Sequence, residues 1–338
     1  MGRKASAAYE KILEKKENAM AKYVVKRILL MLFTLFVITT ICFMLIRMLP
    51  RELPQDKVLQ EVIQARWDAL GYNKPLLVQY GIYLKNIFTA WDFGTSWYIE
   101  QLKPAWDVLV ERLLPTVLVN LYSLVFSIPL GIGFGILAAI KKNRWQDHVI
   151  STVVMLFVSV PSYVYAFLVQ YFFSFKLNIF PLTVYSLADA GGSWFTGKMF
   201  YSMIPPVLAL SFAEIAGLCR FTRAELTETL TSDYMLLART KGLTRAQATT
   251  RHALKNAMVP ILPMIISSFI SILGGSMIIE QIFSVSGVGQ LYVKSINLRD
   301  YDVFMVDTIF YTFVGLLAGI VVDISYGFID PRIRMGEK

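Results

Sequence analysis

Residues 234–260 read YMLLARTKGLTRAQATTRHALKNAMVP and lie between two strongly apolar runs. This stretch carries five Lys or Arg residues, one His and no acidic residue, and Gly242 interrupts an otherwise helix-favouring pattern. Ser232 or Asp233 is a suitable N-cap for a first helix over YMLLART. Gly242 then permits a turn, and Thr244 begins a second helix with capping-box spacing. The pattern predicts two basic helices joined by a glycine turn.

The apolar runs around this stretch predict a membrane protein. The chain has 338 residues, 56% of them hydrophobic and 17% charged, and its mean hydropathy is +0.54. A soluble domain of this size carries more charge. A spanning helix needs about 20 apolar residues, whereas barrel strands alternate over short segments, so we predict an all-α integral membrane protein with six transmembrane helices. The six runs lie at 28–46, 116–140, 149–175, 201–219, 259–283 and 304–328.

The distribution of Lys and Arg predicts the orientation. With a cytoplasmic N-terminus, the inside segments are 1–27, 141–148, 220–258 and 329–338, and they hold 21 of the 33 basic residues. The long segment 47–115 counts for little in this rule, and the other outside segments hold only four. Both termini are therefore expected in the cytoplasm. This bias and contact with anionic lipid account for the net charge of +9, so no nucleic-acid partner is expected.

The order of these segments predicts four regions. Residues 1–22 form a charged, helix-prone extension, and no signal-like cleavage site follows the first apolar run. Residues 23–115 hold the first transmembrane helix and a large external segment. Residues 116–328 hold five more helices and the connecting segment 220–258, and residues 329–338 form a cytoplasmic tail.

The chain lacks the motifs of an enzyme. It has no GxxxxGK[ST] phosphate loop, no HExxH and no GxSxG, so we expect no ATPase activity, no catalytic residues and no cofactor. Its two histidines, His148 and His252, are far from either cysteine in the sequence. Cys42 and Cys219 lie in or beside apolar runs, so neither a metal site nor a disulfide framework is expected.

Four carboxylates lie within the predicted spans: Glu214, Glu280, Asp307 and Asp323. A buried charge in a membrane is costly and often functional, so these groups could form the proton or cation relay of a secondary carrier. Structural pairing is the favoured alternative, because Glu280 and Asp307 lie near span ends and Asp323 lies one turn from the cytoplasmic exit. A secondary carrier would depend chiefly on Glu214 and Asp323.

Composition alone leaves the opening stretch with two interpretations. Its basic helices could insert into a groove on a partner protein, or they could lie on lipid. Prolines and glycines within the spans are similarly ambiguous, since they suit either ordinary helix packing or hinges between two transport states. The aromatic residues Tyr163, Tyr165 and Trp194 could line a path or anchor helices at the interface, so the residues of the substrate path stay unknown.

Residues 233–260 resemble the cytoplasmic coupling loop, or EAA loop, of binding-protein-dependent ABC importer permeases. The pattern DYMLLARTKGL followed by RHALKNAMVP is similar to the subfamily that imports oligopeptides, dipeptides and nickel. The resemblance extends from about residue 23 to residue 335. Its other segments, in chain order, are 24–50, 71–97, 111–139, 161–181, 274–303 and 323–334.

The resemblance implies the type I ABC importer transmembrane fold with cytoplasmic coupling helices, with residues 116–328 as the transmembrane domain. It implies a permease subunit of an ATP-driven importer in the bacterial plasma (inner) membrane. Oligopeptides are the favoured solute, and dipeptides or nickel are the alternatives. The implied partners are a second homologous permease, two cytoplasmic ATPases that hold ATP and Mg, and an external solute-binding protein. The residues implied in ATPase contact are Asp233, Tyr234, Ala238, Arg239, Lys241, Gly242 and Arg245.

Three features depart from the family pattern. The 22-residue extension is additional, residues 47–56 lack the usual Gly-Asp-Pro after the first helix, and Ser286 stands where Pro is common. None lies in the coupling loop, so the implied mechanism is unaffected while the identity of the solute stays open.

Overall fold

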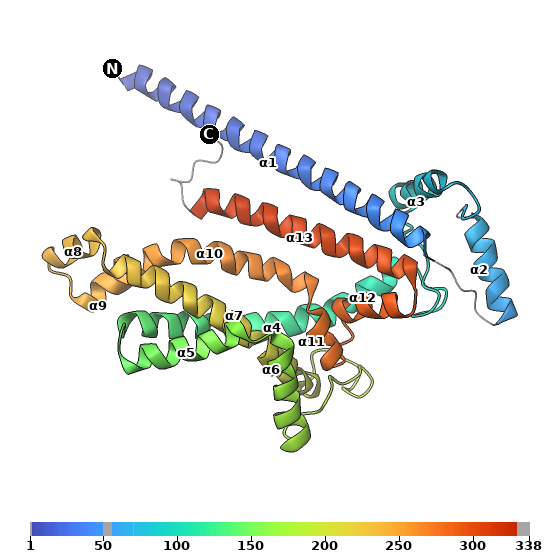
Figure 1. The fold of residues 1–338 in the computed structure, drawn as a ribbon. Coiled ribbons are helices and arrows are strands. Elements are labelled where there is room, and N and C mark those ends of the chain that lie inside the picture. The colour runs from blue at the N-terminus through green and yellow to red at the C-terminus, as the bar shows by residue number, and fades with distance from the viewer. Residues whose placement is uncertain (1, 50–55, 70, 330–338) are drawn as a thin grey trace. The chain divides into compact units, whose positions relative to one another are not determined.

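The computed structural model describes residues 2–49, 56–69 and 71–329 (Figure 1). The chain divides into two compact units, residues 1–92 with 308–338 and residues 93–307. Within the described ranges every secondary-structure element is a helix, apart from a single isolated β-bridge between Thr95 and Pro104. The predicted all-α class is confirmed.

The first unit contains α1 (Gly2–Arg47), α2 (Lys57–Ala69), α3 (Leu76–Ala90) and the part of α13 (Tyr301–Ile329) that begins at residue 308. α3 packs on the C-terminal part of α1. The Phe43 ring lies 5.1 Å from the Tyr80 ring and 5.0 Å from the Tyr83 ring, and the Thr40 and Tyr80 hydroxyls are 2.6 Å apart. Residues 22–47 form an apolar candidate span, so α3 packs against the C-terminal part of that span.

The second unit contains the other helices and short helical turns. They are α4 (Ala105–Ile140), α5 (Trp145–Ser159), α6 (Ser162–Val169), η1 (Gln170–Lys176), α7 (Gly197–Leu230), α8 (Asp233–Thr240), α9 (Arg245–Ala248), η2 (Thr249–Ala253), α10 (Leu254–Ser271), η3 (Ile272–Gly274), α11 (Met277–Ile282) and α12 (Val288–Asn297), and α13 begins in it.

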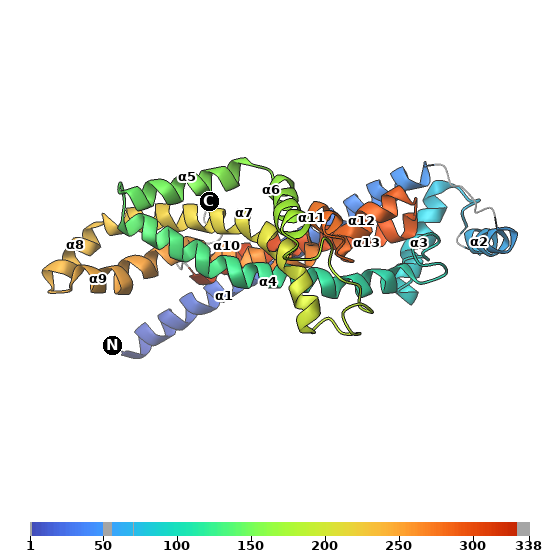
Figure 2. The same cartoon turned by 90° about the horizontal axis from the view of Figure 1, so that it is seen from below.

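α4 and α7 run side by side and form the centre of the second unit (Figure 2). Glycines on α4 permit this close approach. A Cβ atom added to Gly135 would lie 2.5 Å from the Thr222 Cβ, and one added to Gly131 would lie 2.8 Å from the Leu218 Cβ. Small residues thus let two membrane helices pack almost backbone to backbone.

The number of spans agrees with the prediction, but one span is bent. Five described helices are long and apolar enough to cross a membrane, and a sixth span would be the pair Trp145–Ser159 and Ser162–Lys176, which meet at an angle of 104°. Val160 is extended there because the following residue, Pro161, disfavours the helical conformation. Figure 1 shows α6 turning away from α5.

The boundaries of two other predicted spans also differ. α7 continues eleven residues past the predicted end, to Leu230, so the connection before α8 is short. The predicted span 259–283 instead corresponds to a continuous helical segment from Arg245 to Gly274. Gly275 ends it with a φ of 61°, and α11 follows as a separate short helix.

Candidate coupling site

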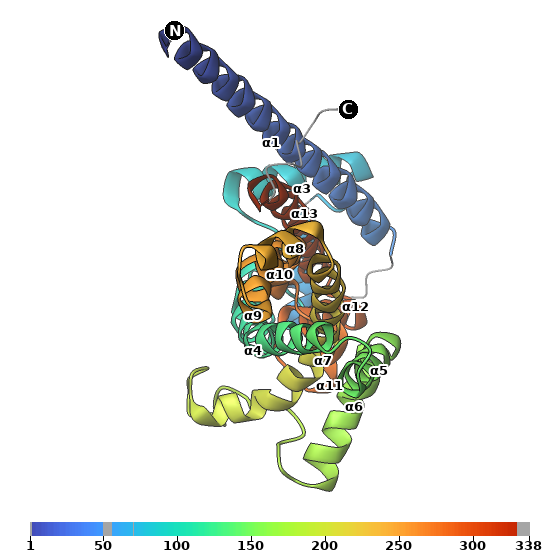
Figure 3. The same ribbon diagram turned by 90° about the vertical axis from the view of Figure 1, so that its left-hand side faces the viewer.

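α8 and α9 meet at a glycine turn at one end of the second unit, next to the ends of α7 and α10 (Figures 1 and 3). Gly242 has a φ of 88°, a conformation that residues with a Cβ rarely adopt, and its N–H donates to the Arg239 carbonyl at 3.0 Å. The Gln247 N–H donates to the Thr244 hydroxyl at 3.3 Å, and the Thr244 N–H donates to the Gln247 side chain at 3.0 Å. The predicted turn and capping box are both present.

A cluster of small apolar side chains anchors this turn to the membrane helices. Ala238 of α8 and Ala248 of α9 are 6% and 0% exposed, and they pack in one core cluster with Ala139 of α4 and Leu226 of α7. Ala253 and Ala257 extend the cluster toward α10. Since alanines leave little space between backbones, α8 and α9 are held directly against the ends of α4 and α7.

The structure separates the residues implied in coupling into two groups. Six are exposed: Asp233, Tyr234, Arg239, Lys241, Gly242 and Arg245. Ala238 points inward and supports the turn, so its side chain is not available to a partner. Two residues that the sequence did not single out, Leu236 and Leu237, are 66% and 56% exposed. The inward positions of Met235 and Ala238, three residues apart, leave these leucines on the outer face of α8.

An ion pair fixes the turn between α4 and α5 near this site. Arg223 of α7 donates to both carboxylate oxygens of Asp147, at 2.5 and 2.9 Å. Asp147 also accepts from the Asn143 N–H at 2.9 Å, in a turn where Asn143 has a φ of 62°. Asp147 therefore holds the turn and links α5 to α7. No local sequence pattern marks Asp147 as paired, because its partner Arg223 is 76 residues away.

Three of the four intramembrane carboxylates have structural partners. Asp323 pairs with Arg27 at 2.9 Å, and Glu214 accepts from the Ser268 hydroxyl at 2.8 Å. Glu280, which is 2% exposed, accepts from the Thr116 hydroxyl at 2.9 Å and from the Gln290 N–H at 3.0 Å. This pairing favours the structural interpretation over an ion relay through Glu214 and Asp323.

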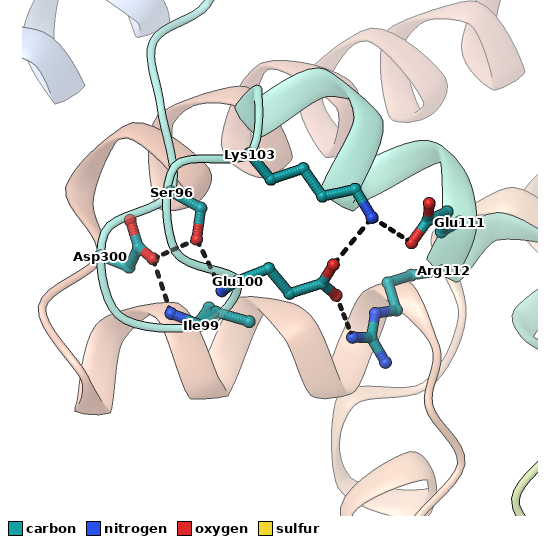
Figure 4. A network of polar contacts seen from close by, with 7 residues as sticks. All are labelled: Ser96, Ile99, Glu100, Lys103, Glu111, Arg112 and Asp300. Carbon is teal, nitrogen blue, oxygen red and sulfur yellow. Dashed lines mark hydrogen bonds and ion pairs between the residues drawn. The ribbon is translucent and has the colours of Figure 1, made fainter.

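A second polar cluster lies at the other end of α4, where residues 96–99 wrap around one carboxylate (Figure 4). Asp300 is fully buried and accepts from the Ser96 hydroxyl at 2.7 Å. It also accepts from the N–H groups of Trp97, Tyr98 and Ile99, at 3.1, 3.0 and 3.0 Å. The segment before α4 is thereby fastened to the residue before α13.

Beside it, Glu100 joins the loop to α4 (Figure 4). Its carboxylate pairs with Lys103 at 2.8 Å and with Arg112 at 2.6 Å. Burial of Glu100 opposes its charged form, but the hydrogen bonds from Lys103 and Arg112 outweigh burial and hold the pKa of Glu100 below its usual value. The loop is therefore fixed at both ends by charged groups.

Two family models match this chain, and together they extend from residue 20 to residue 335. Residues 131–335 match the family "Binding-protein-dependent transport system inner membrane component", and residues 20–119 match its N-terminal family. The chain is 36% identical over 317 residues to the dipeptide transport system permease protein DppB of Lactococcus lactis subsp. cremoris (strain MG1363), covering 94% of this chain and 100% of the relative.

Two further relatives match the chain with similar identity and coverage. Identity is 33% over 322 residues to DppB of Bacillus subtilis (strain 168), covering 94% and 100% of the two chains. It is 33% over 319 residues to the glutathione transport system permease protein GsiC of Escherichia coli (strain K12), covering 93% and 99%. A solved structure of the MetNI methionine ABC transporter, in inward-facing conformations, aligns with a TM-score of 0.48 at 15% identity over 65% of this chain and 97% of that chain.

The family consists of membrane permeases of ABC importers, whose ATPases are separate subunits. With its several apolar helices, the chain is a multi-pass inner-membrane protein. It belongs to the family of inner-membrane components of binding-protein-dependent transport systems.

Proposed function

We propose that the chain is a permease subunit of an ATP-driven importer and forms half of a translocation path for peptides, oligopeptides in particular. Family membership over nearly the whole chain supports the importer role. The relatives named for dipeptides and for glutathione support a peptide as the solute, since both are short peptides. Nickel and dipeptides are the competing solutes within the same family.

In this proposal the chain works in a complex. A second homologous permease completes the path, two cytoplasmic ATPases hold ATP and Mg, and an external solute-binding protein delivers the peptide. Both termini and the α8–α9 turn lie in the cytoplasm, as the excess of Lys and Arg in those segments supports. The chain itself contributes neither a catalytic group nor a cofactor site.

The main support for a coupling role is that the α8–α9 turn is exposed on its outer face and packed through alanines against α4 and α7 on its inner face. Tyr234, Leu236 and Leu237 present an apolar outer face, and Arg239 and Lys241 add positive charge beside it. Such a mixture suits a short helix that docks into a groove of a partner, with apolar contacts for affinity and charges for orientation. The alanine cluster on the inner face then passes any displacement of the turn to α4 and α7.

Replacement of Gly242 tests this role. No heavy atom lies within 4 Å of a Cβ added there, so Gly242→Val strains the backbone at φ 88° without a steric clash. We expect peptide uptake by cells that express the complete importer to be lost, while the chain still inserts. Gly191 is a matched control, since it has a φ of 90° and equally open surroundings in another loop. Unimpaired uptake in Gly242→Val, or equal loss in Gly191→Val, would contradict the proposal.

Crosslinking identifies the partner directly. A single cysteine replaces Lys241 in a chain freed of Cys42 and Cys219, and the adduct formed in native membranes is identified by mass spectrometry. We expect an ATPase that contains a phosphate loop. Adducts with lipid alone would favour a surface-lying helix instead. Competition of uptake by dipeptides, longer peptides and nickel then decides the solute class.

A further inference from the structure

Glu214 of α7 and Ser268 of α10 meet deep within the apolar part of the second unit. The Ser268 hydroxyl donates to the Glu214 carboxylate at 2.8 Å. Glu214 is the one charged residue within 199–219, and Ser268 lies near the centre of 256–279, which include no charged residue. Stretches of this length are long enough to cross the hydrocarbon of a bilayer, so the bond between the two side chains lies far from either membrane surface.

The Glu214 carboxylate has no cationic partner in the part of the chain that the structure describes. Its hydrogen bond comes from a hydroxyl, which is neutral and leaves the negative charge uncompensated. Asp323 differs in this respect, because Arg27 pairs with it at 2.9 Å. A charged side chain inside a membrane is costly, and such groups almost always pair with an opposite charge or face a water-filled cavity. Glu214 therefore needs water or a cation that this chain does not supply.

Open space lies beside Glu214 on α7. Gly217 is three positions further along and so lies on the same face of the helix, and a Cβ atom added to it has no heavy atom within 4 Å. The neighbouring Ala213 is exposed, and on α10 the exposed Ser271 lies one turn from Ser268. The carboxylate is thus surrounded by small and hydroxyl-bearing residues, which indicates a face that borders water rather than lipid.

The chemistry of this face indicates which cation it accepts. It offers one carboxylate and serine hydroxyls, whereas nickel is suited by imidazole ligands. Among the described residues, no group of three His, Cys, Asp or Glu side chains could hold a metal ion. An ammonium group carries three hydrogen-bond donors and no acceptor, so oxygen acceptors satisfy it. Every linear peptide with a free N-terminus carries such a group at neutral pH. The face therefore suits a peptide ammonium better than a metal ion.

We propose that Glu214 lines the translocation path and binds the N-terminal ammonium of a passing peptide, while the Ser268 hydroxyl holds the carboxylate in place. Gly217 leaves room beside it for the peptide backbone. The inference rests on the proposed function, because it takes the solute to be a peptide. Conduction requires binding that is strong enough for entry and weak enough for release, and a single carboxylate meets both conditions. Glu214 thus acts in solute recognition and not in an ion relay.

Cysteine labelling of the complete importer, turning over ATP with its solute-binding protein in proteoliposomes, tests the assignment. Ala213→Cys, in a chain freed of Cys42 and Cys219, places a thiol beside Glu214 and keeps the carboxylate. The thiol is labelled with a cationic and with an anionic methanethiosulfonate reagent, in the presence and absence of trialanine or N-acetyl-trialanine. Glu214→Gln is then added, and the matched control is Glu225→Gln, which removes another carboxylate of α7 about three turns away.

We expect the cationic reagent to react about tenfold faster than the anionic one, Glu214→Gln to remove this preference and Glu225→Gln to keep it. Trialanine should slow the labelling, N-acetyl-trialanine should not, and Glu214→Gln should abolish the protection, because the interaction needs both the ammonium and the carboxylate. A thiol that reacts with neither reagent, or a preference for the cation that survives Glu214→Gln, would overturn the assignment.

Three other outcomes identify what occupies the face instead. Reaction in the isolated chain but not in the importer would overturn the path in favour of a contact with a partner subunit. Equal protection by the two peptides would overturn the ammonium as the ligand. A wild-type importer that takes up no peptide would refute the proposed function and the peptide ligand with it, and the reagent preference would still show whether Glu214 borders an aqueous path.

Discussion

Replacing Asp300 should release the segment in front of α4. Its buried carboxylate accepts three backbone hydrogen bonds, from Trp97, Tyr98 and Ile99, in addition to one from the Ser96 hydroxyl. A hydrogen bond to a charged group stabilises by about 1.5 kcal/mol or more, so the three backbone bonds together contribute about 4.5 kcal/mol. Asp300→Ala should therefore raise the opening equilibrium of this segment about 2,000-fold.

Asp300→Asn separates the charge from the shape. The amide keeps one oxygen as an acceptor, but a neutral hydrogen bond is about half as strong as a charged one, so the expected loss is about 2 kcal/mol, or roughly 30-fold. Ser96→Ala removes a single bond to Asp300 and the acceptor for the Glu100 N–H, and we expect an effect of about tenfold.

Hydrogen–deuterium exchange of peptides that cover residues 94–104, in the full chain in lipid nanodiscs, measures these opening equilibria. Exchange at α7 serves as the internal reference for global stability. Unchanged exchange in Asp300→Ala would refute the reasoning, because the carboxylate would then not hold the segment. An effect of Asp300→Asn equal to that of Asp300→Ala would show that the charge carries the whole interaction and that the retained shape and acceptor contribute nothing.

Two further variants test the helix packing and the membrane depth of α3. A Cβ atom added to Gly135 would lie 2.5 Å from the Thr222 Cβ, so Gly135→Val should lower the stability of the chain in thermal unfolding by about 1–3 kcal/mol. A Cβ atom added to Gly133 has no heavy atom within 4 Å, so Gly133→Ala should leave the stability unchanged. Trp91 follows α3 and is 60% exposed. In a variant that keeps Trp91 as its only tryptophan, we expect brominated lipid to quench the Trp91 fluorescence strongly. Quenching by an aqueous quencher alone would place α3 in water.

The sequence predicts the features that depend on neighbouring residues. Apolar runs predict the spanning helices because hydropathy is a property of consecutive residues, and the capping box is a contact between Thr244 and Gln247, three positions apart. The left-handed conformation of Gly242 is likewise a local feature, because it depends on this glycine and the turn that it forms. These features could therefore be identified before any tertiary structure was known.

Features that depend on distant partners could not be predicted in this way. Asp300 lies more than 200 residues from its four donors, and Asp147 lies 76 residues from Arg223, so no local pattern marks either carboxylate as buried and paired. Proline shows the same limit. Pro129 stays inside α4, whereas Pro161 separates α5 from α6, so the presence of a proline does not by itself show whether a helix continues.

The base of the coupling turn shows how a small displacement could reach several spans. Ala238 and Ala248 contact Ala139 and Leu226, so a push on the turn acts at once on the ends of α4 and α7, and α9 continues directly into α10. Side chains as short as alanine have no rotamers that could absorb such a movement. α5 is connected more narrowly, through the pair of Asp147 with Arg223 and the turn that Asp147 holds. In the proposed importer, α4, α7 and α10 would therefore respond to the ATPase as one body at this end. α6 could move separately beyond the bend at Pro161, since no continuous helix joins it to α5.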